Sequence, residues 1–491
     1  MIESPTITSL VELLQLDSVT SDVNQIITHV RTLHSLIINP ASMIECIRSG
    51  APFVLSSLAR EKVVLESGEA AAEIAEALMS IAQNEVGDQA CVQSGATSAL
   101  TSLLHERAVV SFKGAVAAIS GALANIAMSE NGKQSCVDAN SPSVLTSLLV
   151  HEKNIIEDEE AVERIVSALM IIASSDDGNA ACINAGAVSA LLDLMKEKDV
   201  KKNCNLLLRI AATISNMVTS DAGLTACLHC DAAEVLTSLL KERAIKEDGN
   251  AAGRVAGAIR NFARSNESIK ACVKAGTPFA LTSLAQEKAI MENGDAICSI
   301  AGALSNLSND DDDGKQACLD AGAVSILVSL TRERVVRENS LAAESVSGAL
   351  SHFSYDDDGL YSCITAGATA ALVSLAREKA IRASSNAAGN ITAALANISR
   401  SEAGLRSCIN SGAIAVLTAL VREKAIKESV DVIETFSGFI SNVARSEAGV
   451  HSCLDAGVVD VLLALAKENR ENEEVAECVG VAYFAITGSE I

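Results

Sequence analysis

Apolar residues recur along this chain with the spacing of α-helices. In the segment 323–330, Val324, Leu327 and Val328 share one helical face, and Leu330 flanks it. Polar turns such as Glu292-Asn293-Gly294-Asp295 separate one such segment from the next. The pattern predicts an all-α protein.

Residues 310–354 illustrate the order of the predicted elements. Acidic residues open a short first helix, where carboxylates suit the positive end of the helix dipole, and Ala317, Cys318 and Ala321 line one side of it. A second helix follows and closes in a charged segment, after which a polar turn precedes a third helix. The chain is therefore expected to repeat a unit of three helices.

The end of the first helix carries a repeated signal. Most units place glycine there, and the two exceptions are Asn140 and Asp231, which tolerate a left-handed backbone best after glycine. Two residues later, three units have a proline that suits the first turn of a second helix. The glycines are Gly50, Gly95, Gly186, Gly276, Gly322, Gly367, Gly412 and Gly457, and the prolines are Pro52, Pro142 and Pro278.

A cysteine marks the period of the repeat at 45 or 46 residues. A fixed period of this size is typical of a solenoid, in which each unit stacks on its neighbours. We expect an N-terminal capping half-repeat over residues 1–39 and one continuous domain of about ten units over residues 40–491. The periodic cysteines are Cys46, Cys91, Cys136, Cys182, Cys227, Cys272, Cys318, Cys363, Cys408 and Cys453.

These cysteines are interpreted as reduced, buried thiols. Stacked units place them about 10 Å apart, whereas a disulfide needs Cα atoms within about 7 Å. Only 2% of the residues are aromatic against 49% hydrophobic, so small aliphatic residues must build the core. Free thiols in such number suit a reducing compartment.

The composition limits the partners. Thirty-eight Lys and Arg against 62 Asp and Glu give a net charge of −24, which repels nucleic acid and anionic membranes and favours a basic protein segment. No apolar run reaches the roughly 18 residues of a membrane span, and the start MIESPTITSLVELLQL lacks the features of a signal peptide. A soluble cytoplasmic protein is expected, with the nucleus as an additional location.

The repeated motif resembles the armadillo repeat. The order of a short helix, A-G-A, V-x-x-L-x-x-L and then A-L-x-N-(L/I/F) is shared, and 303–307 (Ala-Leu-Ser-Asn-Leu) matches the third-helix signature closely. The resemblance covers about residues 40–491. It implies a right-handed α-solenoid, a superhelix whose third helices line a concave groove that binds an extended segment of another protein.

In that family, the signature asparagine holds the backbone of the bound peptide, and an amide can donate to C=O and accept from N–H. The alternative is that these amides bond neighbouring helices within the solenoid. We call the position of this asparagine the slot. In other units it is occupied by Ser35, Ser80, Ile171 and His352. The matching asparagines are Asn125, Asn216, Asn261, Asn306, Asn397 and Asn442.

A nuclear-import adaptor is a less favoured reading. Such adaptors carry tryptophan one turn before the asparagine, and this chain contains no tryptophan. The position is instead Gly121, Ala212, Gly257, Gly302, Ala393 or Gly438.

Arginines recur on the same helical face. Arg164, Arg209 and Arg254 lie seven residues before the slot, at intervals that match every third residue of an extended chain. They are candidates for binding acidic or phosphorylated side chains, with pairing to local Glu160 and Glu163 as the alternative. A further set, three residues after the slot, comprises Arg264, Arg400 and Arg445.

A charged pair closes each predicted second helix and is expected to form ion pairs between stacked units. In the last unit it becomes Glu468-Asn469, where nothing is expected to stack beyond it. The acidic runs 310–313 and 356–358 are interpreted as solvated helix starts, since the calcium-loop spacing is absent. The pairs are Glu61-Lys62, Glu106-Arg107, Glu152-Lys153, Glu197-Lys198, Glu242-Arg243, Glu287-Lys288, Glu333-Arg334, Glu378-Lys379 and Glu423-Lys424.

No motif of an enzyme, cofactor or metal site is found. Cys227, His229 and Cys230 lack a second pair of ligands, and phosphate-loop and nucleophile motifs are absent. We expect a non-enzymatic, monomeric interaction scaffold. The alternatives are a guanine-nucleotide exchange regulator of small GTPases, whose armadillo-type units are similar to residues 84–95, and a cytoskeletal armadillo protein.

Overall fold

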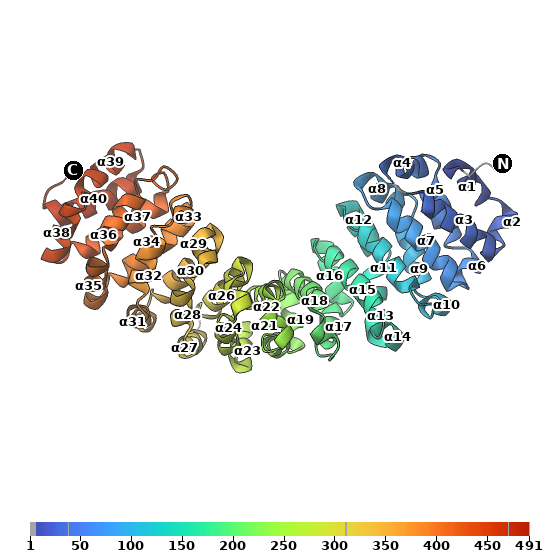
Figure 1. The fold of residues 1–491 in the computed structure, drawn as a ribbon, viewed down its shortest axis with the longest axis horizontal. Coiled ribbons are helices and arrows are strands. Elements are labelled where there is room, and N and C mark those ends of the chain that lie inside the picture. Colours follow the sequence, from blue (N-terminus) through green and yellow to red (C-terminus); the bar gives the residue numbers. More distant parts are fainter. Residues whose placement is uncertain (1–5, 38, 310–311, 470, 491) are drawn as a thin grey trace. The chain divides into compact units, whose positions relative to one another are not determined.

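The computed structural model describes residues 6–37, 39–309, 312–469 and 471–490. In these ranges every regular element is a helix, and the helices pack in chain order, so the predicted all-α solenoid is confirmed. The chain divides into two compact units, unit 1 (Met1–Ala232) and unit 2 (Ala233–Ile491). Figure 1 shows the stacked helices of each unit.

The described chain starts with α1 (Ile7–Leu13), α2 (Asp17–Thr20) and α3 (Val23–Leu36), and the repeats follow. Each repeat opens with a first helix of about ten residues, capped in most repeats by the side chain of Ser, Asn or Asp. The first helices are α4 (Pro40–Arg48), α8 (Glu85–Gln93), α12 (Glu130–Asp138), α16 (Asp176–Asn184), α19 (Asp221–His229), α23 (Asn266–Ala275), α27 (Asp312–Asp320), α31 (Asp357–Ala366), α35 (Glu402–Ser411) and α38 (Glu447–Asp455).

The predicted left-handed cap between the first and second helices is confirmed. All eight glycines have φ between 68° and 80°, and Asn140 and Asp231 adopt φ of 60° and 54°. Pro52, Pro142 and Pro278 lie in the first turn of a second helix, as expected. The second helices are α5 (Ala51–Leu58), α9 (Ala96–Leu103), α13 (Ser141–His151), α17 (Ala187–Leu194), α20 (Ala232–Leu239), α24 (Thr277–Leu284), α28 (Ala323–Leu330), α32 (Ala368–Leu375), α36 (Ala413–Leu420) and α39 (Val458–Glu468).

The charged segment after the second helix differs from the prediction. In most repeats it forms a separate helix of about one turn, so the Glu-Lys/Arg pair begins a short helix and does not close the second one. Four residues are too few to show a hydrophobic period, which is why the pattern did not reveal it. The short helices are α6 (Lys62–Leu65), α10 (Arg107–Val110), α14 (Lys153–Ile156), the 3₁₀ helix η1 (Val200–Lys202), α21 (Arg243–Glu247), α25 (Lys288–Met291), α29 (Arg334–Glu338) and α33 (Lys379–Arg382).

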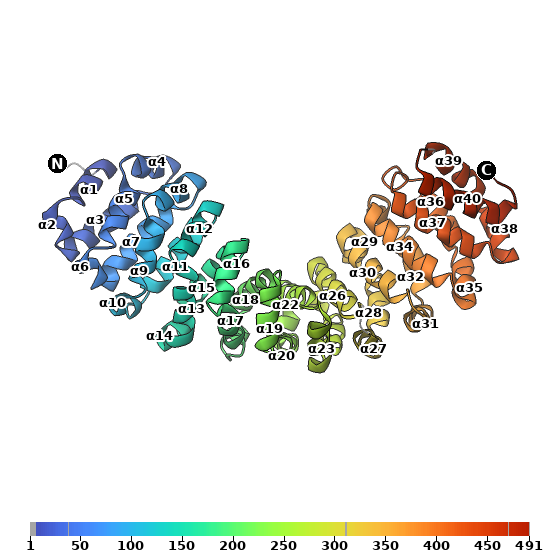
Figure 2. The same cartoon turned by 180° about the vertical axis from the view of Figure 1, so that it is seen from behind.

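The third helices are the longest elements in most repeats and lie side by side within each unit (Figure 2). Each packs on the third helices before and after it in its unit. They are α7 (Gly68–Ile81), α11 (Ala115–Ile126), α15 (Glu159–Ile172) and α18 (Cys204–Met217) in unit 1, and α22 (Gly249–Phe262), α26 (Gly294–Leu307), α30 (Ser340–Phe353), α34 (Ser385–Ile398), α37 (Val430–Val443) and α40 (Glu473–Thr487) in unit 2.

A second glycine series lies where most third helices meet the next first helix. At Gly404, for example, an added Cβ would lie 1.9 Å from the carbonyl oxygen of Ile398. The same clash with a carbonyl six or seven residues upstream occurs across the series, so only glycine allows the two helices to approach this closely. The series is Gly87, Gly132, Gly178, Gly223, Gly314, Gly359, Gly404 and Gly449.

Ser268 replaces this glycine in one repeat, and the preceding turn changes with it. Ala263 takes ψ of 65°, whereas the equivalent Ser399 and Ala444 have ψ of −8° and −5°. The Ser268 hydroxyl instead forms a reciprocal capping box with Ser265. A Cβ is therefore accommodated only with a different backbone.

The ten periodic cysteines are fully buried free thiols, as predicted. The thiols of Cys91, Cys182 and Cys408 point at carbonyl oxygens of the adjoining third helix, with Sγ–O distances of 3.9–4.0 Å. Burial in this apolar layer raises the pKa of each periodic thiol to about 12. These thiols behave as small core residues.

The predicted ion pairs between repeats occur, and they involve only the acidic member of each charged pair. The basic member of the charged pair binds a Glu one turn later in its own repeat, as in Arg334–Glu338 at 2.9 Å. The acidic member instead binds a basic residue of the preceding repeat. In unit 2 these pairs are Lys246–Glu287 (3.0 Å), Arg337–Glu378 (2.5 Å), Arg382–Glu423 (3.8 Å) and Lys427–Glu468 (3.3 Å).

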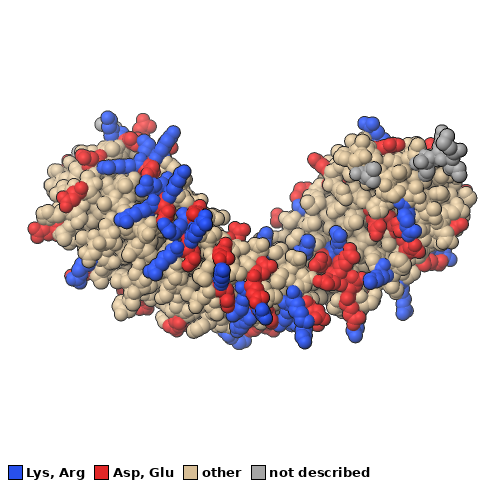
Figure 3. Space-filling view, viewed as in Figure 1, with Lys and Arg blue, Asp and Glu red and all other residues tan. Residues whose placement is uncertain are grey.

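Glu468 therefore still forms one of these ion pairs between repeats, although the next residue is Asn469 and not a basic residue. Figure 3 shows the basic side chains gathered over the part of unit 2 that contains α29 and α33. The charged groups of these ion pairs are partly exposed, so each pair contributes under about 1 kcal/mol to the free energy of unfolding.

Among the described helices, none is long and apolar enough on its own to cross a membrane. Two consecutive pairs, α35 with α36 and α38 with α39, meet that test only when joined across bends of 69° and 70°.

Candidate functional site

The candidate site is the third-helix face, which we define as the half-buried and exposed side chains along one side of the third helices. The predicted asparagines all lie on it and are all half-buried. Asn125 and Asn216 belong to unit 1. Asn261, Asn306, Asn397 and Asn442 belong to unit 2.

The asparagine amides tie successive third helices together. In five of the six, Nδ2 donates to a carbonyl 46 residues earlier, in the last turn of the preceding third helix. Carbonyls in the last turn of a helix lack the usual helical N–H donor, so the amide supplies a donor from the next helix. The carbonyls of Ser351 and Ala396 also accept from the hydroxyls of Ser354 and Ser399, at 2.8 and 2.7 Å. The bonds are Asn125 to Met79 (2.9 Å), Asn216 to Met170 (3.3 Å), Asn306 to Arg260 (2.8 Å), Asn397 to Ser351 (3.2 Å) and Asn442 to Ala396 (3.2 Å).

This finding confirms the alternative considered for the sequence, that the asparagines bond neighbouring helices. This structural role still permits ligand binding, because the bond between helices uses only the NH₂ group of each side chain. Among the described residues, no partner is recorded for Oδ1 of Asn125, Asn306, Asn397 or Asn442. Each fixed amide thus presents an oriented acceptor.

The slot that carries histidine keeps a bond to the end of the preceding third helix, but to a carbonyl 44 residues earlier and not 46. His352 Nε2 lies 3.2 Å from the carbonyl oxygen of Ser308, at the end of α26. On the next third helix, two turns before Asn397, Asn390 Nδ2 donates to the Glu344 carbonyl inside α30 at 3.0 Å. Side chains of the third-helix face therefore bond the neighbouring third helix at more positions than the signature asparagine.

The arginines three residues after the slot have a structural role that sequence reasoning missed. Arg400 Nη1 donates to the carbonyl of Tyr355 at 2.9 Å and lies over its ring, with Cζ 5.7 Å from the ring centroid. Arg445 Nη2 donates to the carbonyls of Ser399 and Arg400 at 3.3 and 3.2 Å. A cation at the C-terminus of the neighbouring third helix is favourable because the helix dipole is negative there.

The arginines seven residues before the slot make fewer contacts. Arg164 is exposed and extends over Gly121, and Arg209 Nη1 donates to Ser167 Oγ at 2.9 Å. Arg254 is exposed on α22. In the described part of the chain no ion pair joins them to Glu160 or Glu163, the acidic residues considered as local partners.

The position one turn before the asparagine is small throughout. At Gly302, the aliphatic part of Arg260 from α22 occupies the space, and a Cβ there would lie 2.5 Å from Arg260 Cδ. At Gly121, the sulfur of Met79 lies 2.7 Å from such a Cβ. The small residues thus let side chains of the preceding third helix lie flat across the face.

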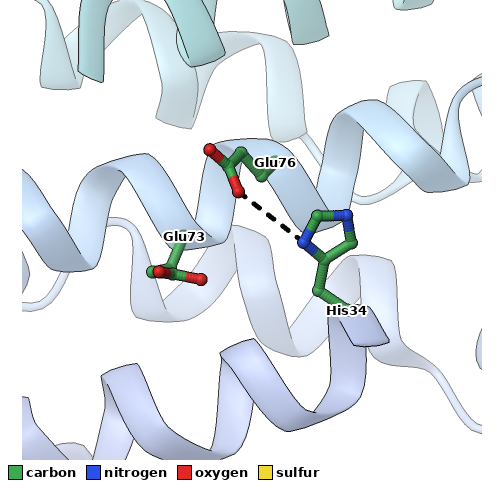
Figure 4. A group of neighbouring side chains, drawn as sticks. All are labelled: His34, Glu73 and Glu76. Atoms are coloured by element: carbon green, nitrogen blue, oxygen red, sulfur yellow. Dashed lines mark ion pairs between the residues drawn. The ribbon is translucent and has the colours of Figure 1, made fainter. Parts of the chain in front are cut away.

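A group of His34, Glu73 and Glu76 lies between α3 and α7 (Figure 4). His34 Nδ1 lies 3.7 Å from Glu76 Oε2, and Nε2 lies 2.9 Å from Ser80 Oγ. Arg31 donates from Nε to Glu73 at 2.7 Å and also pairs with Glu69. Because a guanidinium already neutralises Glu73, we interpret the group as a bond between two helices.

The other motifs weighed from the sequence are local. Cys227 is buried in the core, while Cys230 is half-exposed at the end of α19. Asp356 caps α31 by accepting from the Gly359 amide at 3.0 Å, and it also pairs with Lys315. Asp310 and Asp311 lie outside the described residues.

Comparison with known proteins supports the fold. No protein-family model and no curated protein sequence matches the chain. Among solved structures, an engineered protein is similar over 99% of both chains, with a TM-score of 0.67 and 23% identity. A structure from a study of a phosphorylation switch in the interaction between cadherin and β-catenin covers 98% of this chain and 94% of that one, with a TM-score of 0.69 and 14% identity. The chain is thus similar in fold to helical repeat proteins, including one from a protein-interaction complex.

Proposed function

We propose that this chain is a non-enzymatic protein-interaction scaffold of the armadillo type, whose third-helix face forms a groove for an extended segment of a partner. The observation that carries the proposal is the half-buried asparagine at Asn125, Asn306, Asn397 and Asn442, whose NH₂ group is held by the preceding helix while its Oδ1 has no partner among the described residues. The similarity to the cadherin and β-catenin structure agrees with this kind of function.

The geometry suits an extended peptide. Helices in contact are spaced at about 10 Å, which corresponds to about three residues of an extended chain at 3.3 Å each. Asn397 and Asn442 lie on consecutive third helices of unit 2, so their Oδ1 atoms can accept from peptide N–H groups three residues apart. Arg254 and Arg260 on α22, in the same unit, add positive charge for acidic side chains of the segment.

The test uses peptides selected from a random display library against the full chain. Asn397→Ala combined with Asn442→Ala is expected to weaken binding of the selected peptides by about tenfold, because two acceptors are lost. Asn410→Ala is the matched control, since Asn410 is an exposed helical asparagine of α35 in the same unit. Affinity is measured by fluorescence anisotropy.

A second variant separates binding from stability. Asn397→His should retain a bond to the C-terminal end of α30, because His352 reaches the corresponding end of α26 in its own repeat. It should preserve the unfolding midpoint while lowering peptide affinity. Unchanged affinity in both asparagine variants would contradict the proposal. Unchanged nucleotide release from small GTPases would agree with a scaffold and not with an exchange regulator.

A further inference from the structure

A cavity of about 740 Å³ opens in unit 1 at the N-terminal ends of α11 and α15. Its volume lies in the range of ligand pockets, about 300–1,000 Å³. One wall is the connection from α10 to α11, including Phe112 and Lys113. The other wall comes from α14 and the start of α15.

The cavity owes its shape to an unusual connection. Four residues, 111–114, join α10 to α11, whereas two residues join α6 to α7 and α14 to α15. The period does not change, and α11 is shorter by two residues than α7 and α15. Gly114 stands at the start of α11 with φ of 89°, and no side chain caps this helix. The third helix therefore begins late and leaves space beside its neighbour.

The lining is strongly acidic. The lining holds five carboxylates and one ammonium group, that of Lys113, a formal net charge of −4. Glu157 also pairs with Lys153, outside the lining, at 3.5 Å. Figure 3 shows acidic side chains gathered over the part of unit 1 that contains α15. The carboxylates are Glu157, Asp158, Glu159, Glu160 and Glu163.

Neutral contacts orient several of these carboxylates without removing their charge. Asn203 Nδ2 donates to Glu163 at 3.2 Å and also to Glu159. Asp158 caps α15 by accepting from the Ala161 amide at 3.2 Å. Glu160 is exposed and has no recorded partner among the described residues. The cavity thus holds fixed negative charge that a cation can neutralise.

The opposite wall supplies apolar surface. Phe112 is 40% exposed and lines the cavity. Val110 and Val116 border it as well but are almost fully buried. An aromatic ring next to carboxylates suits a side chain with an aliphatic stem and a cationic head. Lysine and arginine have this composition.

We propose that this cavity binds a basic segment of a partner protein, with lysine or arginine side chains against Phe112 and the α15 carboxylates. Glu159 and Glu163 are separated by about 6 Å of helix rise, close to the distance between alternate residues of an extended chain. The preferred segment therefore carries basic residues at alternate positions. The inference rests on the proposed scaffold function for the partner being a protein, and it adds a contact away from the asparagines.

The probe is a fluorescein-labelled peptide in which Lys alternates with Ser, titrated into the full chain at low salt. Glu160→Gln combined with Glu163→Gln is expected to weaken binding by about tenfold, because two carboxylates facing the cations are lost. Glutamine at 163 can still accept from Asn203. Phe112→Leu is expected to weaken binding less, since it retains an apolar surface.

The control removes the same charge elsewhere in unit 1. Asp176→Asn with Asp177→Asn changes two exposed acidic residues at the start of α16 and should alter the affinity by less than about twofold. Equal losses in the two double variants would show that the peptide responds to net charge alone and would overturn the proposal, as would unchanged binding in the cavity variant. Because the asparagine variants of unit 2 are tested with other peptides, either proposal can fail while the other holds.

Discussion

Raising the pH from 8 to above 10 is expected to unfold the protein cooperatively. Burial raises the pKa of each periodic thiol to about 12, whereas an unfolded cysteine titrates near about 8.5. Above that pH the unfolded chain loses protons that the folded chain retains, so the free energy of unfolding falls. The stabilisation is complete below about pH 8.5 and is lost as the pH approaches 12.

The size of this effect follows from the number of thiols. Each thiol contributes a loss of about 1.4 kcal/mol per pH unit between the two pKa values. Five of the ten lie in each unit, so a domain of ordinary stability, about 5–15 kcal/mol, cannot tolerate a rise of more than about two pH units. Urea unfolding followed by circular dichroism at a series of pH values measures how the free energy of unfolding changes per pH unit.

Single cysteine variants isolate the thiol contribution from the titration of lysine and tyrosine. Cys182→Ala should make the free energy of unfolding fall less steeply with pH, by the contribution of one buried thiol, even if it lowers stability at pH 7. Cys230→Ala is the control in the same unit, because water reaches this side chain at the end of α19. Equal slopes for wild type and Cys182→Ala would contradict the explanation.

Replacing Gly404 by alanine is expected to destabilise unit 2 by about 2–4 kcal/mol. The new Cβ would lie 1.9 Å from the Ile398 carbonyl oxygen, so α35 would have to move away from the end of α34. That movement would also strain the cap in which Ser401 Oγ accepts from the Gly404 amide at 3.0 Å. The measurement is the urea midpoint, together with hydrogen exchange of the α35 amides.

Gly412→Ala is the matched control eight residues later. Gly412 has φ of 75°, but no atom lies within 4 Å of an added Cβ. Its cost is the left-handed strain alone, about 1 kcal/mol. A loss as large at Gly412 as at Gly404 would show that backbone conformation, and not the approach of the two helices, explains the second glycine series.

The two glycine series differ in how well they can be read from the sequence. Gly412 ends a helix, and a helix end is a local event, so its positive φ could be predicted. Gly404 lies in the first turn of a helix, where a single helix gives no reason for glycine. Its reason is a carbonyl from the preceding third helix, which becomes a neighbour only when the repeat folds.

In the candidate site, too, some features could be predicted from the sequence and others depend on the tertiary structure. The position of Asn397 on a third helix followed from the repeated motif, but its bond to Ser351 depends on how two helices are aligned along their axes. The sequence shows that Arg337 and Glu378 are charged, but only the stacking of the repeats determines that they pair with each other. The cavity beside Phe112 arises where α11 starts two residues late, a change that leaves the period intact and therefore does not disturb the pattern.

By itself, the sequence determined the helical class, the repeat of 45 or 46 residues, the left-handed caps and the buried thiols. Each of these depends on residues close together in the chain or on a periodic hydrophobic face. Only the tertiary structure decided which carbonyl each asparagine binds, which charges pair between repeats and where a cavity opens. Those contacts join residues about 40 to 46 positions apart, and a shift of one residue between stacked helices would change every one of them.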